Sequence, residues 1–98
     1  MIRVLVADDH PVVRQGICAM LEVEPDLEVV ADVGDGTQAV DLTLARSPDV
    51  VLMDVQMPGL DGIEVPRAVK DSSTVVVLLT AFSQRSLIEN ARDAGVAA

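Results

Sequence analysis

The sequence predicts an α/β fold, a three-layer sandwich in which helices cover both faces of a parallel sheet. Short apolar runs rich in β-branched residues alternate with segments of helical periodicity along the chain. The runs are apolar at consecutive positions, which is typical of strands that are covered on both faces. A helix separates each strand from the next, so we expect right-handed crossovers and parallel strands.

The first strand is predicted at Ile2–Ala7, a short and mostly apolar run. Apolar residues at helical spacing then predict a helix over Pro11–Glu22, with the proline in its first turn and Asp9 or His10 as its cap. A Glu-Pro-Asp turn ends this helix. The apolar run at 27–31 is predicted as the second strand, and a glycine-rich turn follows it.

The middle of the chain adds one helix and one strand. Apolar positions within 37–46 favour an amphipathic helix, and Thr37 is its predicted cap. Pro48 ends the helix, because proline lacks the backbone donor and disfavours a helical conformation in the residue before it. The apolar run at 49–53 is then the third predicted strand.

The last part of the chain repeats the alternation. A dense turn signal at 57–62 precedes a short predicted helix at 63–70. A continuous apolar run predicts the fourth strand at 74–79, and helical spacing predicts a helix at 84–94. A further strand is expected to begin at Val96.

Composition limits the possible functions. The chain has 98 residues, half of them hydrophobic, so we expect one domain with a single core. The net charge is -9, which argues against nucleic-acid binding through displaced counterions. A single cysteine excludes an internal disulfide, and no Cys/His spacing predicts zinc. No apolar run nears the roughly 20 residues of a membrane helix, so a soluble, cytoplasmic protein is expected.

Polar side chains directly follow three of the predicted strands. Asp8 and Asp9 follow the first strand, Asp54 follows the third, and Thr80 follows the fourth. Because the carboxyl ends of parallel strands share one edge of a sheet, we expect these side chains to converge there. Tandem acids also cap helices, but three carboxylates gathered at one edge repel one another and need a cation. Mg²⁺, which is held by a few carboxylates and by water, fits such a cluster.

Asp54 has the setting of a nucleophile, because it ends the central strand and precedes a flexible turn. A carboxylate in this role is phosphorylated to an acyl phosphate. Asp8 and Asp9 would hold the metal ion, which offsets the charge that develops during in-line phosphoryl transfer. Thr80 would donate a hydrogen bond to a phosphoryl oxygen.

Three segments resemble the receiver domain of two-component response regulators: Val-Leu-Val-Ala-Asp-Asp-His-Pro at 4–11, Leu-Met-Asp-Val-Gln-Met-Pro-Gly-Leu-Asp-Gly at 52–62, and Leu-Leu-Thr-Ala at 78–81. The resemblance implies a flavodoxin-like parallel sheet with strand order 2-1-3-4-(5). It also implies a sensor histidine kinase as phosphoryl donor. The functional residues that it implies are the phosphoacceptor Asp54, the magnesium ligands Asp8, Asp9, Asp54 and the Gln56 backbone carbonyl, and the phosphate-sensing hydroxyl of Thr80.

The two ends of the chain resemble different branches of this family. Asp-Asp-His-Pro-Val-Val-Arg-Gln-Gly at 8–16 is similar to NarL/FixJ-type receivers, which precede a helix-turn-helix DNA-binding domain. The segment at 79–95 is similar to receivers that precede an RNA-binding ANTAR antiterminator domain. The effector is therefore expected to be one of these two domains, and no effector is expected within residues 1–98.

The sequence also departs from the family pattern. Receivers usually carry a fifth strand with a phosphate-contacting lysine and then a fifth helix, so residues 1–98 are expected to be a receiver that is incomplete at its C-terminus. Without that lysine, metal binding should persist while the coupling between phosphorylation and the Thr80 loop weakens. The strand at 74–79 would be left as an apolar edge, so we hypothesise a homodimer or a strand-exchanged oligomer.

Other functions compete with a phosphorylatable switch as interpretations of the sequence. A metal-dependent phosphohydrolase is disfavoured, because such enzymes place nucleophile and second acid two residues apart after the first strand. A receiver-like module that only dimerises is the second alternative. A nucleotide-binding fold lacks its glycine loop here. We expect a signalling phosphoacceptor, with self-catalysed phosphoryl transfer and slow autodephosphorylation, and not an enzyme. His10 is interpreted as a helix-start residue, and Cys18 receives no role.

Overall fold

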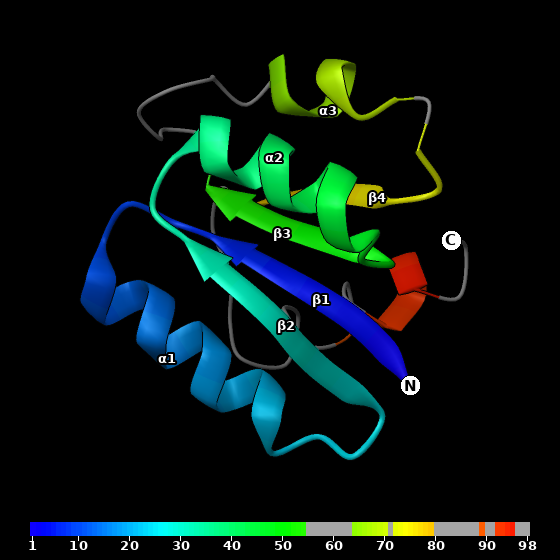
Figure 1. The fold of residues 1–98 in the computed structure, drawn as a ribbon. Coiled ribbons are helices and arrows are strands. Elements are labelled where there is room, and N and C mark those ends of the chain that lie inside the picture. The colour runs from blue at the N-terminus through cyan, green and yellow to red at the C-terminus, as the bar shows by residue number, and fades with distance from the viewer. Residues whose placement is uncertain (55–63, 71, 80–88, 90–91, 96–98) are drawn as a thin grey trace.

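In the part of the chain that the structure describes, the protein folds around a four-stranded parallel sheet with strand order β2-β1-β3-β4. The computed structural model describes residues 1–54, 64–70, 72–79, 89 and 92–95. The order β2-β1-β3-β4 is the predicted one for these four strands. Figure 1 shows the sheet as the middle layer, with α2 and α3 over one face and α1 over the other. The predicted flavodoxin-like sandwich is confirmed.

The observed elements follow the predicted sequence of strands and helices closely. They are β1 (Ile2–Ala7), α1 (Pro11–Glu22), β2 (Leu27–Val33), α2 (Gly36–Arg46), β3 (Val50–Asp54), α3 (Glu64–Ala68) and β4 (Val75–Leu79). Strand β2 is two residues longer than predicted, since Asp32 and Val33 continue its pairing with β1. Most of the helix predicted at 84–94, and the strand predicted from Val96, lie outside the described residues. Within the described part, residues 92–95 are helical.

Helix α2 is capped at both ends, and its N-terminal cap is a different residue from the predicted one. Asp35 is the N-cap residue, and its carboxylate accepts a hydrogen bond from the Gln38 backbone N–H at 2.7 Å. The prediction of Thr37 as cap was therefore wrong, because the aspartate two residues earlier already satisfies the first turn. At the other end Ser47 adopts φ 47° and donates its N–H to the Thr43 carbonyl. This left-handed residue ends the helix directly before Pro48, as the proline predicted.

Helix α3 is shorter than the predicted 63–70, and it contains Pro66 at its third position. Proline is tolerated in the first turn, because the N–H groups there have no partner within the helix. Val65 and Val69 anchor this short element, since both side chains are buried.

Alternate residues of the strands enter two separate hydrophobic clusters, one on each face of the sheet. Val4 and Val6 of β1 pack with Ile17 and Leu21 of α1. Leu5 of β1 and its strand neighbours pack on the opposite face, against α2 and α3. Successive side chains of a strand point to opposite faces, so consecutive apolar residues fill both clusters.

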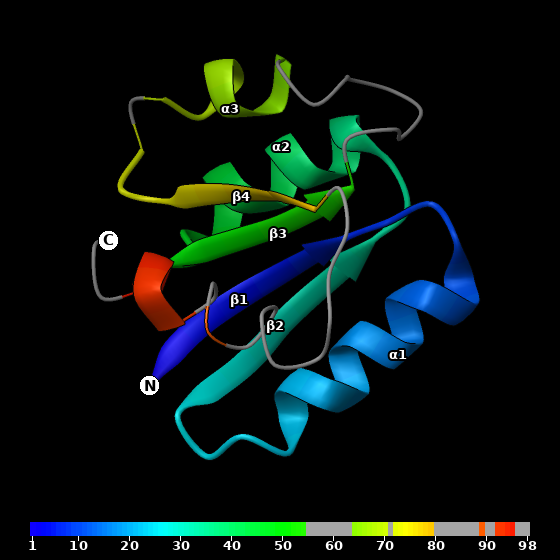
Figure 2. The ribbon, with the colours of Figure 1, turned by 180° about the vertical axis from the view of Figure 1, so that it is seen from behind.

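The helical residues 92–95 lie on the α1 face of the sheet. Ala94 is buried in the cluster that contains Ile17 and Leu21. Figure 2 shows this segment in red beside the start of β1. A Cβ atom on Gly95 would lie 2.5 Å from a methyl carbon of Ile2, so only glycine permits this approach.

None of the helices in the described part of the chain has the length and apolarity that a membrane span requires. All of the helices given above are shorter than such a span.

Candidate metal and phosphoacceptor site

The register between β1 and β3 brings the predicted acids to one edge of the sheet. Ala7, the last residue of β1, pairs with Met53, and Asp54 ends β3 one residue later. Asp8 follows Ala7 directly, so the two aspartates leave neighbouring strands at the same level. The site lies between β1 and β3, where the strand order reverses direction, which is where open α/β sheets bind ligands.

Four side chains converge at this edge. Asp8, Asp9, His10 and Asp54 each offer one potential metal-ligating atom, and these atoms all lie within 4.8 Å of one another. The three carboxylates that the sequence analysis singled out are thus brought together. The structure adds the imidazole of His10, which the sequence analysis placed only at the start of a helix.

Asp8 is held in place by contacts from three elements. Its side chain is only 4% exposed, and Oδ1 accepts a hydrogen bond from the His10 backbone N–H at 2.8 Å. Its backbone N–H donates to the Val33 carbonyl of β2 at 3.0 Å. Its backbone carbonyl accepts a hydrogen bond from Nη1 of Arg14 at 2.8 Å. These bonds fix the turn between β1 and α1, which carries the tandem acids.

One side-chain oxygen of Asp9 is buried and accepts no hydrogen bond from the described residues. This atom is Oδ1. Nδ1 of His10 lies 2.9 Å from this oxygen, but the contact is not a hydrogen bond. A buried carboxylate oxygen that accepts no hydrogen bond is costly, and a bound cation would lower this cost. The hydrogen bond from the His10 N–H to Oδ1 of Asp8 closes a local turn before α1, and it does not involve Asp9.

The arrangement fits a hard divalent cation. Mg²⁺ takes oxygen ligands at about 2.1 Å in octahedral geometry, which separates neighbouring ligands by roughly 3 Å and opposite ligands by roughly 4.2 Å. The observed upper limit of 4.8 Å between ligating atoms is compatible with one shared ion. The unsatisfied Oδ1 of Asp9 points to the same conclusion. Asp8, Asp9 and Asp54 are the residues that would hold it.

Two further predicted site residues lie outside the described residues. These are Gln56, whose backbone carbonyl is the predicted fourth metal ligand, and Thr80, the predicted phosphate sensor. The strand that precedes Thr80 is described: β4 ends at Leu79, which pairs with Asp54 of β3. The backbone of β4 therefore reaches the same edge of the sheet as the acid cluster.

Arg14 is a site residue that was not predicted from the sequence. Its guanidinium binds the Asp8 carbonyl through Nη1 and the Asp32 carboxylate through Nε, at 2.8 and 3.0 Å. It links α1, the β1–α1 turn and the end of β2. The available signal was its position: a basic residue in the first turn of the helix that directly follows tandem acids.

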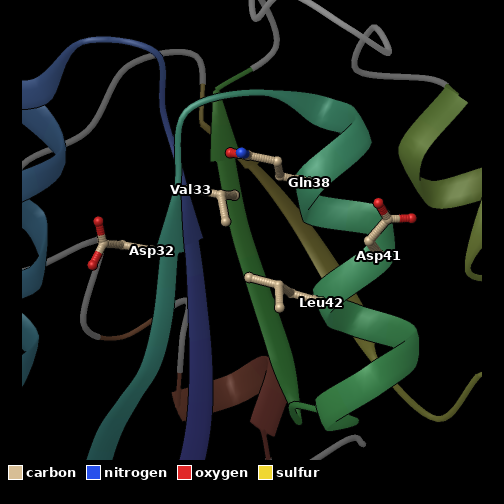
Figure 3. A pocket seen from close by; sticks show the side chains of 5 residues that line it. All are labelled: Asp32, Val33, Gln38, Asp41 and Leu42. Atoms are coloured by element: carbon tan, nitrogen blue, oxygen red, sulfur yellow. The ribbon is translucent and has the colours of Figure 1, made fainter.

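A separate hollow of about 390 Å³ lies between β2 and α2. Figure 3 shows Val33, Gln38 and Leu42 in the space between the strand and the helix, whereas Asp32 points to the other side of β2. Asp41 completes the lining. No residue of the acid cluster contributes to this hollow.

Comparison with known proteins agrees with this geometry. The response regulator receiver domain family matches residues 4–98, which is nearly the whole chain. The transcriptional regulatory protein LiaR of Bacillus subtilis is 46% identical over 84 residues, which cover 84% of this chain and 40% of LiaR. PdtaR of Mycobacterium tuberculosis is 45% identical over 97 residues, which cover 98% of this chain and 47% of PdtaR. The chain therefore spans less than half of the length of these two relatives.

Solved structures show the same similarity. The receiver domain of the NarL response regulator of M. tuberculosis superimposes with a TM-score of 0.79 at 38% identity, covering 96% of this chain and 77% of that domain. The response regulator domain of Thermotoga maritima CheB gives 0.76 at 35% identity, covering 97% and 73%. The NarL similarity agrees with the resemblance of the N-terminal segment, while the ANTAR resemblance stays a prediction. The chain belongs to the response regulator receiver domain family of two-component systems.

Proposed function

We propose that this chain is the Mg²⁺-dependent phosphoacceptor of a response regulator and is phosphorylated on Asp54. One observation supports this most directly. Asp8, Asp9 and Asp54 place ligating atoms within 4.8 Å of one another at the carboxyl edge of β1 and β3, and Oδ1 of Asp9 is buried without a hydrogen bond from any described residue. A metal-dependent phosphohydrolase is not favoured. Such enzymes place the nucleophile and a second acid two residues apart after the first strand, whereas Asp8 and Asp9 are adjacent and Asp54 ends β3.

The proposed reaction transfers a phosphoryl group from a histidine of the sensor kinase to Asp54. One carboxylate oxygen of Asp54 attacks phosphorus, the O–P bond forms, and the N–P bond of the phosphohistidine breaks. The electron pair of that bond returns to the imidazole, which then takes a proton from solvent. A bound Mg²⁺ supplies charge neutralisation for the transferring phosphoryl oxygens. Asp8 and Asp9 hold that charge beside Asp54, and the contacts of Asp8 keep the turn in position.

The output side of the proposal rests on the family resemblance. An acyl phosphate on Asp54 adds negative charge and acceptor oxygens, which the Thr80 hydroxyl contacts. The loop and helix after β4 then shift between two states, and this changes the surface that an effector domain meets. The effector is a DNA-binding helix-turn-helix or an RNA-binding ANTAR domain. The proposed setting is the cytoplasm, and water slowly hydrolyses the acyl phosphate.

The test is phosphorylation of the tag-free chain by acetyl phosphate in the presence of Mg²⁺. The expected product is a single adduct that is stable in acid and cleaved by hydroxylamine, as an acyl phosphate is. Asp54→Asn should abolish it, and so should removal of Mg²⁺ with a chelator. Asp41→Asn, an exposed aspartate of α2, is the matched control and should retain the adduct. An adduct that persists in Asp54→Asn would overturn the assignment.

A further inference from the structure

His10 occupies an unusual place for a residue that starts a helix. Its Nδ1 lies 2.9 Å from Oδ1 of Asp9 and 3.3 Å from Oδ1 of Asp8. The same cluster includes a carboxylate oxygen of Asp54 within 4.8 Å of the other ligating atoms. The imidazole nitrogen therefore faces the same small space as three carboxylates.

The backbone fixes this placement of His10. Its N–H donates to Oδ1 of Asp8, and Pro11 follows it as the first residue of α1. His10 is the N-cap residue, yet its side chain makes no capping hydrogen bond. The ring is thus not needed to begin the helix, while its side chain stays 68% exposed and accessible to an incoming ion.

We propose that His10 is a nitrogen ligand of the metal site, so that this site favours Zn²⁺ over Mg²⁺ more strongly than carboxylates alone would. The inference rests on the proposed metal site of Asp8, Asp9 and Asp54. Three carboxylates form a hard oxygen site that suits Mg²⁺, whereas imidazole nitrogen is a preferred ligand of Zn²⁺ and other late transition metals.

The distances agree with this set of ligands. Zinc binds histidine nitrogen and carboxylate oxygen at about 2.1 Å in tetrahedral geometry, which separates ligating atoms by roughly 3.4 Å. Nδ1 of His10 lies 3.3 Å from the Asp8 oxygen and 2.9 Å from the Asp9 oxygen, so small adjustments suffice. The metal would then lie between Nδ1 of His10 and Oδ1 of Asp9, an oxygen that accepts no hydrogen bond from the described residues.

A different role of His10 makes the opposite prediction. If His10 only served as a positive partner of the two acids, it would compete with every cation, and its neutral replacement would strengthen the binding of both Mg²⁺ and Zn²⁺. If His10 is a ligand, the same replacement weakens Zn²⁺ binding and leaves Mg²⁺ binding nearly unchanged. His10→Asn therefore separates the two roles.

The experiment measures Zn²⁺ and Mg²⁺ affinities by calorimetry on the tag-free chain, in a Cys18→Ser background that removes the only thiol. We expect His10→Asn to weaken Zn²⁺ roughly tenfold or more, in the range seen when a metal site loses supporting contacts. Mg²⁺ affinity should stay within roughly twofold, because it depends on the carboxylates. Unchanged or tighter Zn²⁺ binding in His10→Asn would overturn the proposal.

A second readout reports ligation directly. His10 is the only histidine of the chain, so its ring signals in a ¹H–¹⁵N NMR spectrum need no assignment by mutation. Zn²⁺ should shift Nδ1 of His10, and Mg²⁺ should not. If Asp54 and His10 bind the same Zn²⁺ ion, Asp54→Asn should reduce the Zn²⁺-induced shift of the His10 Nδ1 signal. An undiminished shift would show that the zinc binds elsewhere. Loss of Mg²⁺ binding in every variant, including the parent, would instead contradict the metal site of the proposed function.

Discussion

Asp9 shows how repulsion between carboxylates makes this site unfavourable when no cation is bound. Its Oδ1 is buried beside a second acid and has no hydrogen-bond partner among the described residues. Like charges that share a buried site destabilise the folded state unless a cation neutralises them. Folding stability and metal binding are therefore linked through this side chain.

We predict that Mg²⁺ stabilises the protein and that Asp9→Asn removes most of this effect. At a Mg²⁺ concentration of 100 times the dissociation constant, ligand linkage raises the free energy of unfolding by about 2.7 kcal/mol. Without metal, Asp9→Asn should melt at a higher temperature than the parent, because one negative charge of the acid cluster is gone. Thermal melts with and without Mg²⁺ measure both effects. Equal Mg²⁺ stabilisation of parent and Asp9→Asn would show that the ion binds elsewhere.

The thiol of Cys18 is made unreactive by its environment. Burial is the main cause that raises the pKa of this thiol to about 11, and the carboxylates of Asp32 and Glu22 add to it. The thiolate is the reactive form, so it is scarce near neutral pH.

We predict that iodoacetamide modifies Cys18 more slowly in the folded protein than in urea at the same pH. The rate in the folded protein should rise as the pH approaches 11, whereas the unfolded chain should reach its maximal rate at a lower pH. Mass spectrometry of timed samples measures both rates. Equal rates in the two states would contradict an elevated pKa in the fold.

Helix α1 positions the metal-binding turn through Arg14. This side chain binds the Asp8 carbonyl and the Asp32 carboxylate, so it connects the turn to the end of β2. Nη1 also lies 3.0 Å from the place that a Cβ atom of Gly34 would take. The turn after β2 therefore leaves room for the guanidinium.

We predict that Arg14→Gln weakens Mg²⁺ binding, although Arg14 is not a ligand. Groups that orient metal ligands typically change affinity by roughly 10- to 100-fold when they are removed. Gly34→Ala should reproduce part of the loss, because the added methyl group displaces Nη1. Calorimetry gives both affinities, and Arg46→Gln on α2 is the control. Parent-like affinity in Arg14→Gln would mean that the turn keeps its shape by itself.

The helical residues 92–95 are attached to the turn between α1 and β2 by a cluster of charged side chains. Arg92 donates from Nε to Asp26 at 2.7 Å and from Nη2 to Glu24 at 2.7 Å. The hydrogen bond from Arg92 is the main cause that lowers the pKa of Asp26 below 3.8. Asp26 in turn raises the pKa of Arg92.

We predict that Asp26 contributes stability above pH 3.8, and that this contribution is lost as the pH falls through the lowered pKa in the folded state. The parent should therefore lose slightly more stability than Asp26→Asn between pH 5 and pH 2. The effect is small, because the pair is partly exposed and screened by solvent. Urea unfolding at several pH values tests it, with Asp41→Asn as control. Parallel curves for parent and Asp26→Asn would show that the contact does not persist in solution.

For the whole molecule, β4 is the outermost strand of the described sheet next to β3. Its Leu78 side chain is 41% exposed. Apolar outer strands offer unpaired backbone groups to other chains and favour edge-to-edge pairing. The hypothesised homodimer or strand-exchanged oligomer would form through this strand.

We predict that the 98-residue chain self-associates as its concentration rises, and that Leu78→Lys reduces this association. A lysine on an edge strand opposes pairing through its charge and its hydration. Leu44→Lys on α2, where the leucine is 59% exposed, is the matched control and should associate like the parent. Light scattering coupled to size-exclusion chromatography measures the mass. A monomer at all concentrations would contradict the hypothesis.

Local sequence patterns were sufficient for the elements and for their order. Apolar runs and helical spacing predicted all seven elements of the described part, because both patterns reflect which side chains are buried. Errors occurred where two neighbouring signals competed. Asp35 caps α2 in place of Thr37, and β2 continues through Asp32 and Val33, which pair with the end of β1. The roles of Gln56 and Thr80 remain predictions, because both residues lie outside the described residues.

The sequence by itself determined the parallel sandwich and the acids that end its strands, because burial periodicity and strand ends are local properties. The tertiary structure decided which groups meet. The pairing of Ala7 with Met53 sets Asp8 level with Asp54, and among the described residues none donates a hydrogen bond to the buried Oδ1 of Asp9. The roles of His10 and Arg14 depend on how the turn after β1 packs against β2 and β3. Contacts between residues far apart in the chain follow from register and packing, which no local pattern encodes.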